Sequence, residues 1–115
     1  MKTDDVEKYR HDLEIIRLTA DQIIKDFHIF GLEIQFSGNE LTAYDELKKQ
    51  IAPLLFDLYR KKTSAFQSLL YRIDISEKKF SDLLHDSADQ DFSDQLADLV
   101  IRREFQKVLT RKYFS

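Results

Sequence analysis

The sequence contains no cysteine, one proline and two glycines among its 115 residues. Without cysteine, the chain has neither a disulfide framework nor a thiolate for nucleophilic catalysis or zinc binding. The single Pro53 and the two glycines, Gly31 and Gly38, are far fewer than the many turns of an all-β fold require. These shortages favour a helical protein, because helices need few such breaks.

Long apolar runs are also missing from the chain. No stretch approaches the roughly 18 consecutive apolar residues of a membrane-spanning helix. The first five residues, Met-Lys-Thr-Asp-Asp, lack the basic and apolar parts of a secretory signal, so we expect a cytoplasmic protein with no membrane partner. A net charge of −3 argues against broad electrostatic attraction to nucleic acid, although it is compatible with a local basic patch.

The composition that remains is sufficient for one hydrophobic core. Hydrophobic residues make up 43% of the sequence and include nine Phe and five Tyr, while charged residues make up 34%. A chain of this length typically forms one domain. We therefore expect residues 1–115 to form a single helical domain.

The amino-terminal part of the sequence carries the strongest periodic pattern. Eight apolar residues alternate spacings of three and four and so share one stripe of a helix: Val6, Tyr9, Leu13, Ile16, Ala20, Ile23, Phe27 and Phe30. Gly31 follows the last of them, as a C-terminal cap does. We predict a helix over residues 4–30, with a capping box at Thr19 and Gln22 leaving a break near residue 18 as the alternative.

Residues 32–36 differ in kind from the helical pattern. Leu32, Ile34 and Phe36 alternate with polar residues between two glycines, which is the pattern of a short strand. A lone strand has no pairing partner within this chain. One interpretation is therefore an extended connector that lays three apolar side chains on the bundle, and the other is strand pairing across a dimer.

Three further helices are predicted by apolar periodicity. They cover residues 40–61, kinked at Pro53; 64–85, with a break near 74–76 as an option; and 92–113. Whether residues 43–73 form one kinked helix or two abutting helices stays open. Segments of this length joined by short connectors predict an all-α antiparallel bundle of about four helices, in up-down-up-down order.

The last predicted helix has two apolar faces. One is formed by Phe92, Leu96, Leu99 and Val100, and the opposite one by Ile101, Phe105, Val108 and Leu109. Such a helix either passes through the middle of a bundle or offers its second half to a partner. Surplus apolar positions on this helix, the first helix and the 32–36 segment predict a subunit interface: Leu18, Ile34, Phe36, Ile101, Phe105 and Val108.

The last helix is also rich in cations. These are Arg102, Arg103, Lys107, Arg111 and Lys112. On one exposed face they would contact a polyanion such as nucleic acid. The alternative is a purely structural role, because the helix dipole favours positive charge toward a carboxyl end.

Motifs for catalysis, cofactor binding or metal binding are not recognisable. The chain lacks a G-x-S-x-G elbow and a glycine-rich phosphate loop, and we assign no catalytic, cofactor or metal residues. The nearest metal-like spacings are Asp82-x-x-His85 and Glu7-x-x-x-His11 with Glu14. Neither supplies the paired motifs that metal sites in helical bundles use.

One acid stands out by its apolar neighbours. Asp74 lies between Ile73 and Ile75, where a helix interior would bury it. The interpretation that we favour is an N-cap for the following turn, with Glu77 three residues on.

The function hypothesis that follows is a non-enzymatic helical interaction or assembly protein, self-associating as a homodimer. One alternative is a small nucleic-acid-associated regulator that uses the basic last helix. The other is a bundle that binds a metal or small molecule in its interior.

Overall fold

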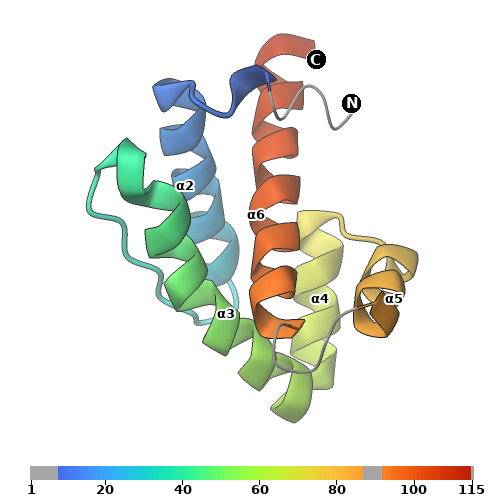
Figure 1. Ribbon diagram of the computed structural model, residues 1–115. Helices are drawn as coiled ribbons and strands as arrows, with labels where there is room; N and C mark the ends of the chain where they lie inside the picture. Colours follow the sequence, from blue (N-terminus) through green and yellow to red (C-terminus); the bar gives the residue numbers. More distant parts are fainter. Residues whose placement is uncertain (1–7, 87–91, 115) are drawn as a thin grey trace.

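The regular structure within the described residues is entirely helical (Figure 1). The computed structural model describes residues 8–86 and 92–114. The helices are α2 (Leu13–His28), η1 (Glu40–Thr42), α3 (Ala43–Lys61), α4 (Thr63–Ile73), α5 (Glu77–Asp86), α6 (Phe92–Leu109) and the π-turn η3 (Thr110–Phe114). The all-α prediction is confirmed. None of these helices combines the length and the apolarity needed to cross a membrane.

Helix α2 begins later than the apolar stripe predicts. The Asp12 carboxylate accepts a hydrogen bond from the Ile15 amide at 3.2 Å and caps the helix at Leu13. The turn at residues 10–12 separates Tyr9 from α2, yet Tyr9 still packs on the same core, which is why the stripe looks unbroken. Residues 4–7 of the predicted helix lie outside the described residues.

No break occurs near residue 18, and α2 ends at the predicted glycine. Thr19 lies inside α2, where its hydroxyl donates to the Ile15 carbonyl at 2.7 Å. Gly31 has φ +76°, a left-handed conformation that glycine adopts without strain. The Leu32 amide then donates back to the Phe27 carbonyl at 3.1 Å, as in a Schellman cap.

The segment that follows α2 is an extended connector. Ile34 is buried, and Leu32 and Phe36 pack on the core, as the first interpretation predicted. The Gln35 backbone exchanges two hydrogen bonds of 2.8 Å with the Gln50 side chain of α3, which fastens the connector along that helix. Strand pairing across a dimer stays a prediction.

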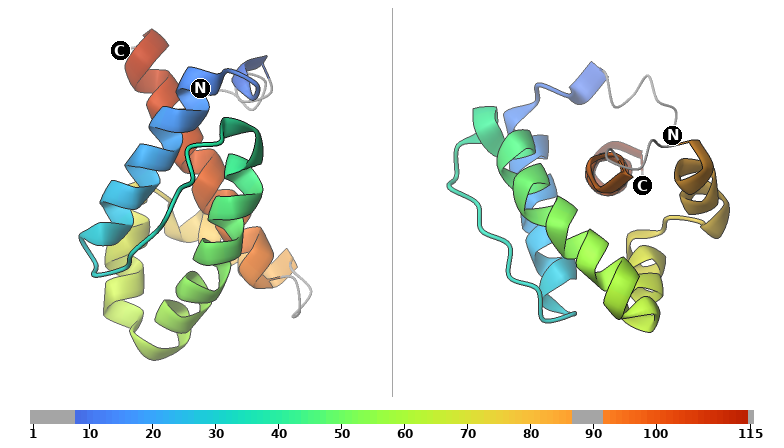
Figure 2. Two further views of the ribbon diagram at one scale, coloured as in Figure 1. Left: turned by 90° about the vertical axis from the view of Figure 1, so that its left-hand side faces the viewer. Right: turned by 60° about the horizontal axis from the view of Figure 1, so that its bottom comes forward.

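The connector also sets the helix directions. It returns along the molecule, so α3 starts beside the start of α2 and the two helices run the same way (Figures 1 and 2). The strict up-down order is therefore wrong for this pair, because the chain between them is long enough to cross back. Helices α4 and α6 run opposite to α2 and α3, which keeps the bundle antiparallel.

The middle of the chain divides at Lys62 and at Asp74. Helix α3 continues through Pro53 to Lys61, and Lys62, with φ −138° and ψ 69°, separates it from α4. The segment 43–73 is thus two helices. Asp74 ends α4 in the left-handed region at φ 69°, and the Ser76 hydroxyl caps α5 by accepting from the Lys79 amide at 3.1 Å.

Helix α6 passes through the middle of the bundle. It packs against α2, α3, α4 and α5, and Figure 2 shows it end-on with the other helices around it. Its first half, including Leu96 and Val100, joins the main core, and its second half forms a smaller core with α2. We call this smaller core the α2–α6 core; its buried members are Ile15, Phe105, Val108 and Leu109. The two apolar faces of α6 are explained by this central position.

Candidate functional site

The residues predicted as an interface lie largely within the chain's own cores. Ile34, Phe105 and Val108 are buried in the fold, which leaves little of these side chains for a partner. Leu18, Phe36 and Ile101 are half-buried and pack against the cores. Ile101 and Phe105 also line a surface groove, described below, so part of this prediction remains available to a partner.

The residues predicted to contact a polyanion each engage an acceptor of the chain itself. Arg102 pairs with Asp98 at 3.0 Å, and Arg103 pairs with the Asp74 carboxylate at 2.6 Å. The other three reach α2: Arg111 donates to Gln22 at 3.0 Å, Lys112 pairs with Glu14, and Lys107 lies beside Asp26. These contacts support the structural interpretation of the basic residues.

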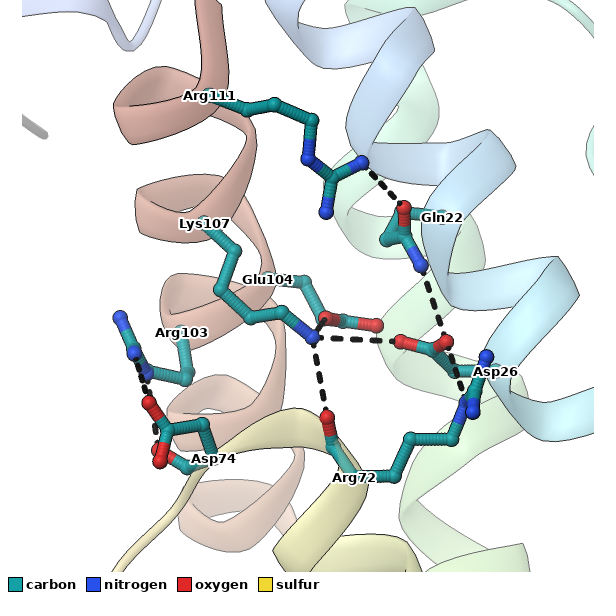
Figure 3. Close-up of polar contacts among 8 residues, drawn as sticks. All are labelled: Gln22, Asp26, Arg72, Asp74, Arg103, Glu104, Lys107 and Arg111. Atoms are coloured by element: carbon teal, nitrogen blue, oxygen red, sulfur yellow. Dashed lines mark hydrogen bonds and ion pairs between the residues drawn. The ribbon is translucent and has the colours of Figure 1, made fainter. Parts of the chain in front are cut away.

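Two acids are buried where α2, α4 and α6 meet (Figure 3). Asp26 of α2 is 1% exposed and Glu104 of α6 is fully buried. Arg72 Nε and Gln22 Nε2 donate to Asp26 Oδ1 at 2.9 and 3.0 Å. Lys107 Nζ lies 3.6 Å from Asp26 Oδ2 and 3.1 Å from Glu104 Oε1. We call Asp26 and Glu104 the buried acid pair.

The hydrogen bonding of this pair improves if it holds a proton. With both acids ionised, Asp26 Oδ2 and the two Glu104 oxygens accept no well-aligned hydrogen bond, although Lys107 Nζ lies 3.1 Å from Glu104 Oε1 as an ion pair. Unsatisfied buried acceptors are costly. A proton on Glu104 supplies the missing donor, through a hydrogen bond between the two carboxyl groups. The pair then carries one negative charge beside the cations Arg72 and Lys107.

The pKa values of Asp26 and Glu104 are shifted in opposite directions, because the two acids differ in the cations and hydrogen-bond donors around them. Burial raises the pKa of Glu104 to about 8, and the neighbouring Asp26 carboxylate adds to the rise. Burial also opposes ionisation of Asp26, but hydrogen bonds from Glu104 and Arg72 and the charge of Lys107 outweigh it and lower the Asp26 pKa. Glu104 is therefore the member of the pair that holds the proton at neutral pH.

The sequence prediction selected a different acid. Asp74 is exposed and forms the left-handed end of α4, so both its burial and its role as an N-cap are wrong. A usable signal was present elsewhere in the sequence. Glu104 stands between Val100 and Val108 at spacings of four, so an acid occupies an apolar row of a helix.

A surface groove of about 430 Å³ lies between α2, α3 and α6. Ile16, Leu47, Ile101 and Phe105 are among the apolar residues that line it. Three further lining side chains are large, apolar and exposed: Leu13, Leu41 and Tyr44. We call this feature the α2–α3–α6 groove.

The polar residues at the groove are of both charge signs. Arg10, His11, Glu40, Asp98 and Arg102 line it. The Tyr44 hydroxyl donates to the Asp98 carboxylate, which Arg102 holds from one turn along α6. Burial, together with this hydrogen bond, raises the pKa of Tyr44, so its phenol stays protonated and serves as a donor.

Metal ligands do not gather in the part of the chain that the structure describes. No three His, Asp or Glu side chains within it are grouped as a metal site. Of the two spacings noted in the sequence, Asp82 pairs with Lys78 at 3.2 Å and Glu14 pairs with Lys112. Glu7 lies outside the described residues.

Comparisons with protein-family models, with curated proteins and with solved structures found no match to this chain. The functional interpretation therefore rests on the geometry of the groove and of the buried acid pair.

Proposed function

We propose that this protein is a helical interaction protein that self-associates through the α2–α3–α6 groove. The observation that carries the proposal is the clustering of exposed apolar side chains. Of the seven large apolar residues that are exposed among those described, three line this one groove. Monomeric proteins seldom gather exposed apolar side chains in this way without a binding role.

A second copy of the chain suits the groove because the exposed Leu41 side chain and the groove itself lie on the same face of the molecule. Leu41 on η1 is 86% exposed and stands at the groove. In a two-fold dimer the same patch is used by both copies, so each Leu41 can enter the groove of the other. The charges at the groove support the same arrangement, since the acidic Glu40 of one copy can face the basic Arg10 of the other.

The chemistry of the groove supports binding over catalysis. Its one phenol is held as a donor to Asp98, and the Asp98 carboxylate is shared between Tyr44 and Arg102. Because these groups already bond to one another, they hold the side chains of a binding surface in place and are not free to act as an acid or a base. An apolar centre with a polar rim is also the usual anatomy of a protein interface.

Light scattering coupled to size exclusion, over a range of protein concentrations, tests the proposal. We expect the native mass to rise with concentration from 13.7 kDa, the mass of one chain, toward that of two chains. Leu41→Asp places a charge at the centre of the contact and should leave the protein monomeric. Tyr71→Asp is the matched control, because Tyr71 is 88% exposed on α4, away from this groove.

Two outcomes would overturn the proposal. One is a native protein with the mass of a single chain at every concentration. The other is a dimer that Leu41→Asp leaves intact, which would place the contact on a different surface.

A further inference from the structure

We propose that the buried acid pair is a proton-dependent latch that fastens the second half of α6 to α2, and that rising pH releases it. This inference does not depend on the self-association proposed above. It concerns a regulatory transition within one chain.

The position of the pair along α6 is the first argument. Glu104 lies between Val100, the last α6 residue buried in the main core, and Phe105, the first in the α2–α6 core. Among the described residues, the α2–α6 core has four buried members and the main core has nineteen. The second half of α6 can therefore open without unfolding the main core, since a smaller apolar core gives less resistance to local opening.

The groups around the pair show why one proton has a large effect. Glu104 faces Asp26 from α2 and Lys107 from its own helix, while Arg72 from α4 approaches through Asp26. The buried residues of α3 are all apolar, and α5 buries no residue among those described. Asp26 already takes its hydrogen bonds from Arg72 and Gln22. Of the cations that the structure describes, Lys107 alone would balance a second carboxylate at Glu104.

The cations Lys107 and Arg111 link the acid pair to the neighbouring helices. Lys107 Nζ also donates to the Arg72 carbonyl at 3.2 Å, so it ties α6 to α4 as well as to the acids. Just beyond the end of α6, Arg111 of η3 donates to Gln22, which in turn donates to Asp26. All of these links meet at the acid pair. Repulsion between two carboxylates there would strain these polar links between the end of the bundle and the second half of α6.

The direction of the pH effect follows from linkage. The Glu104 pKa is about 8 in the folded protein and has an ordinary value of 4.5 when the latch is open and the group is solvated. The closed form therefore binds more protons than the open form between these two values. Opening becomes more favourable by up to about tenfold for each pH unit in this range and levels off above the upper value.

Amide hydrogen exchange at pH 5 and pH 8, expressed as protection factors, measures the opening directly. In the native protein we expect protection at residues 105–109 to fall by at least about tenfold between these pH values, with a smaller fall at residues 96–100. In Glu104→Gln, protection at 105–109 should hold, because the amide stays neutral and can still donate to Asp26.

A matched control is Glu14→Gln, which removes an acid of α2 that pairs at the surface with Lys112 of η3, the turn that continues α6. This variant should keep the native pH dependence. The proposal is overturned if the native protein shows no fall at 105–109, or if Glu104→Gln shows the same fall.

A measurement on the native protein keeps the test independent of whether the variant folds. The ¹³C chemical shift of the Glu104 side-chain carboxyl carbon, followed against pH, should titrate well above pH 6. Titration near pH 4.5 would overturn the proposal, because the pair would then hold no proton at neutral pH.

Discussion

Arg72 Nε lies 2.9 Å from Asp26 Oδ1, and this ion pair joins α4 to a carboxylate of α2 that is 1% exposed. The arginine itself is 38% exposed, so its charge remains partly solvated while the charge of Asp26 does not. Loss of the ion pair would therefore cost more at Asp26, whose charge would stay buried without a partner, than at Arg72, whose charge can be solvated by water. The buried end of such a pair decides what its loss costs.

Replacement of Arg72 by Met should destabilise the protein by about 1–3 kcal/mol, because it removes a donor from a buried carboxylate while keeping the apolar stem. Urea denaturation followed by circular dichroism measures the change. Lys78→Met is the matched control, since Lys78 pairs with Asp82 at 3.2 Å on the surface of α5. Its cost should stay below about 0.5 kcal/mol. Equal costs for the two variants would contradict the buried role of Asp26.

Asp26→Asn tests the other acid of the pair. The variant keeps the shape of the side chain but loses the charge that Arg72 and Lys107 contact, so we expect a loss of about 2–4 kcal/mol at pH 6. Because the folded protein lowers the Asp26 pKa below 3.8, the contribution of this group is present above that value and is lost as pH falls through the folded pKa. The stability gap between native protein and variant should therefore narrow in acid. A gap that stays constant down to pH 2 would contradict the lowered pKa.

The end of α4 offers a test of backbone strain. Asp74 has φ 69°, a conformation that costs any residue with a Cβ more than it costs glycine. Asp74→Ala and Asp74→Gly lose the same contact with Arg103, so the difference between them isolates the backbone. We expect the glycine variant to be about 1 kcal/mol more stable in thermal or urea unfolding. A more stable alanine variant would show that the left-handed turn is not kept in solution.

The helical segments were predictable because apolar periodicity reports burial, whichever neighbour provides it. For the same reason, periodicity did not reveal the break between Tyr9 and the start of α2 at Leu13. Tyr9 and Ile16 pack on the same small core from the two sides of the Asp12 cap, so the stripe continues where the helix does not. Gly31 gave a reliable end to α2, because its backbone conformation depends on the residue itself.

The buried acid pair could not be assembled from the sequence. Asp26 and Glu104 are far apart in the chain, and they meet only because α6 passes through the centre of the bundle. That arrangement depends on the connector before η1, which returns along α3 and makes α2 and α3 parallel. A prediction of strictly alternating helices places α2 and α3 in opposite directions and gives different neighbours.

The interface prediction met a related difficulty. An apolar residue off the main stripe of a helix is equally suited to a second core and to a partner. Val108 is buried in the α2–α6 core within the chain, whereas Ile101 lines the groove that we propose as a contact surface. Sequence periodicity does not distinguish these two destinations, since both remove apolar surface from water.

Self-association through the α2–α3–α6 groove is tested most directly by an intermolecular paramagnetic effect. The chain has no cysteine, so Asp45→Cys places a single nitroxide label on an exposed position of α3 beside Tyr44. Labelled protein is mixed with ¹⁵N-enriched native protein. The account predicts broadening of native amide signals around residues 13–16, 41–47 and 101–105, and much less when the label is at Gln67→Cys on α4. Absence of broadening from the Asp45→Cys label, or broadening confined to residues 63–80, would contradict it.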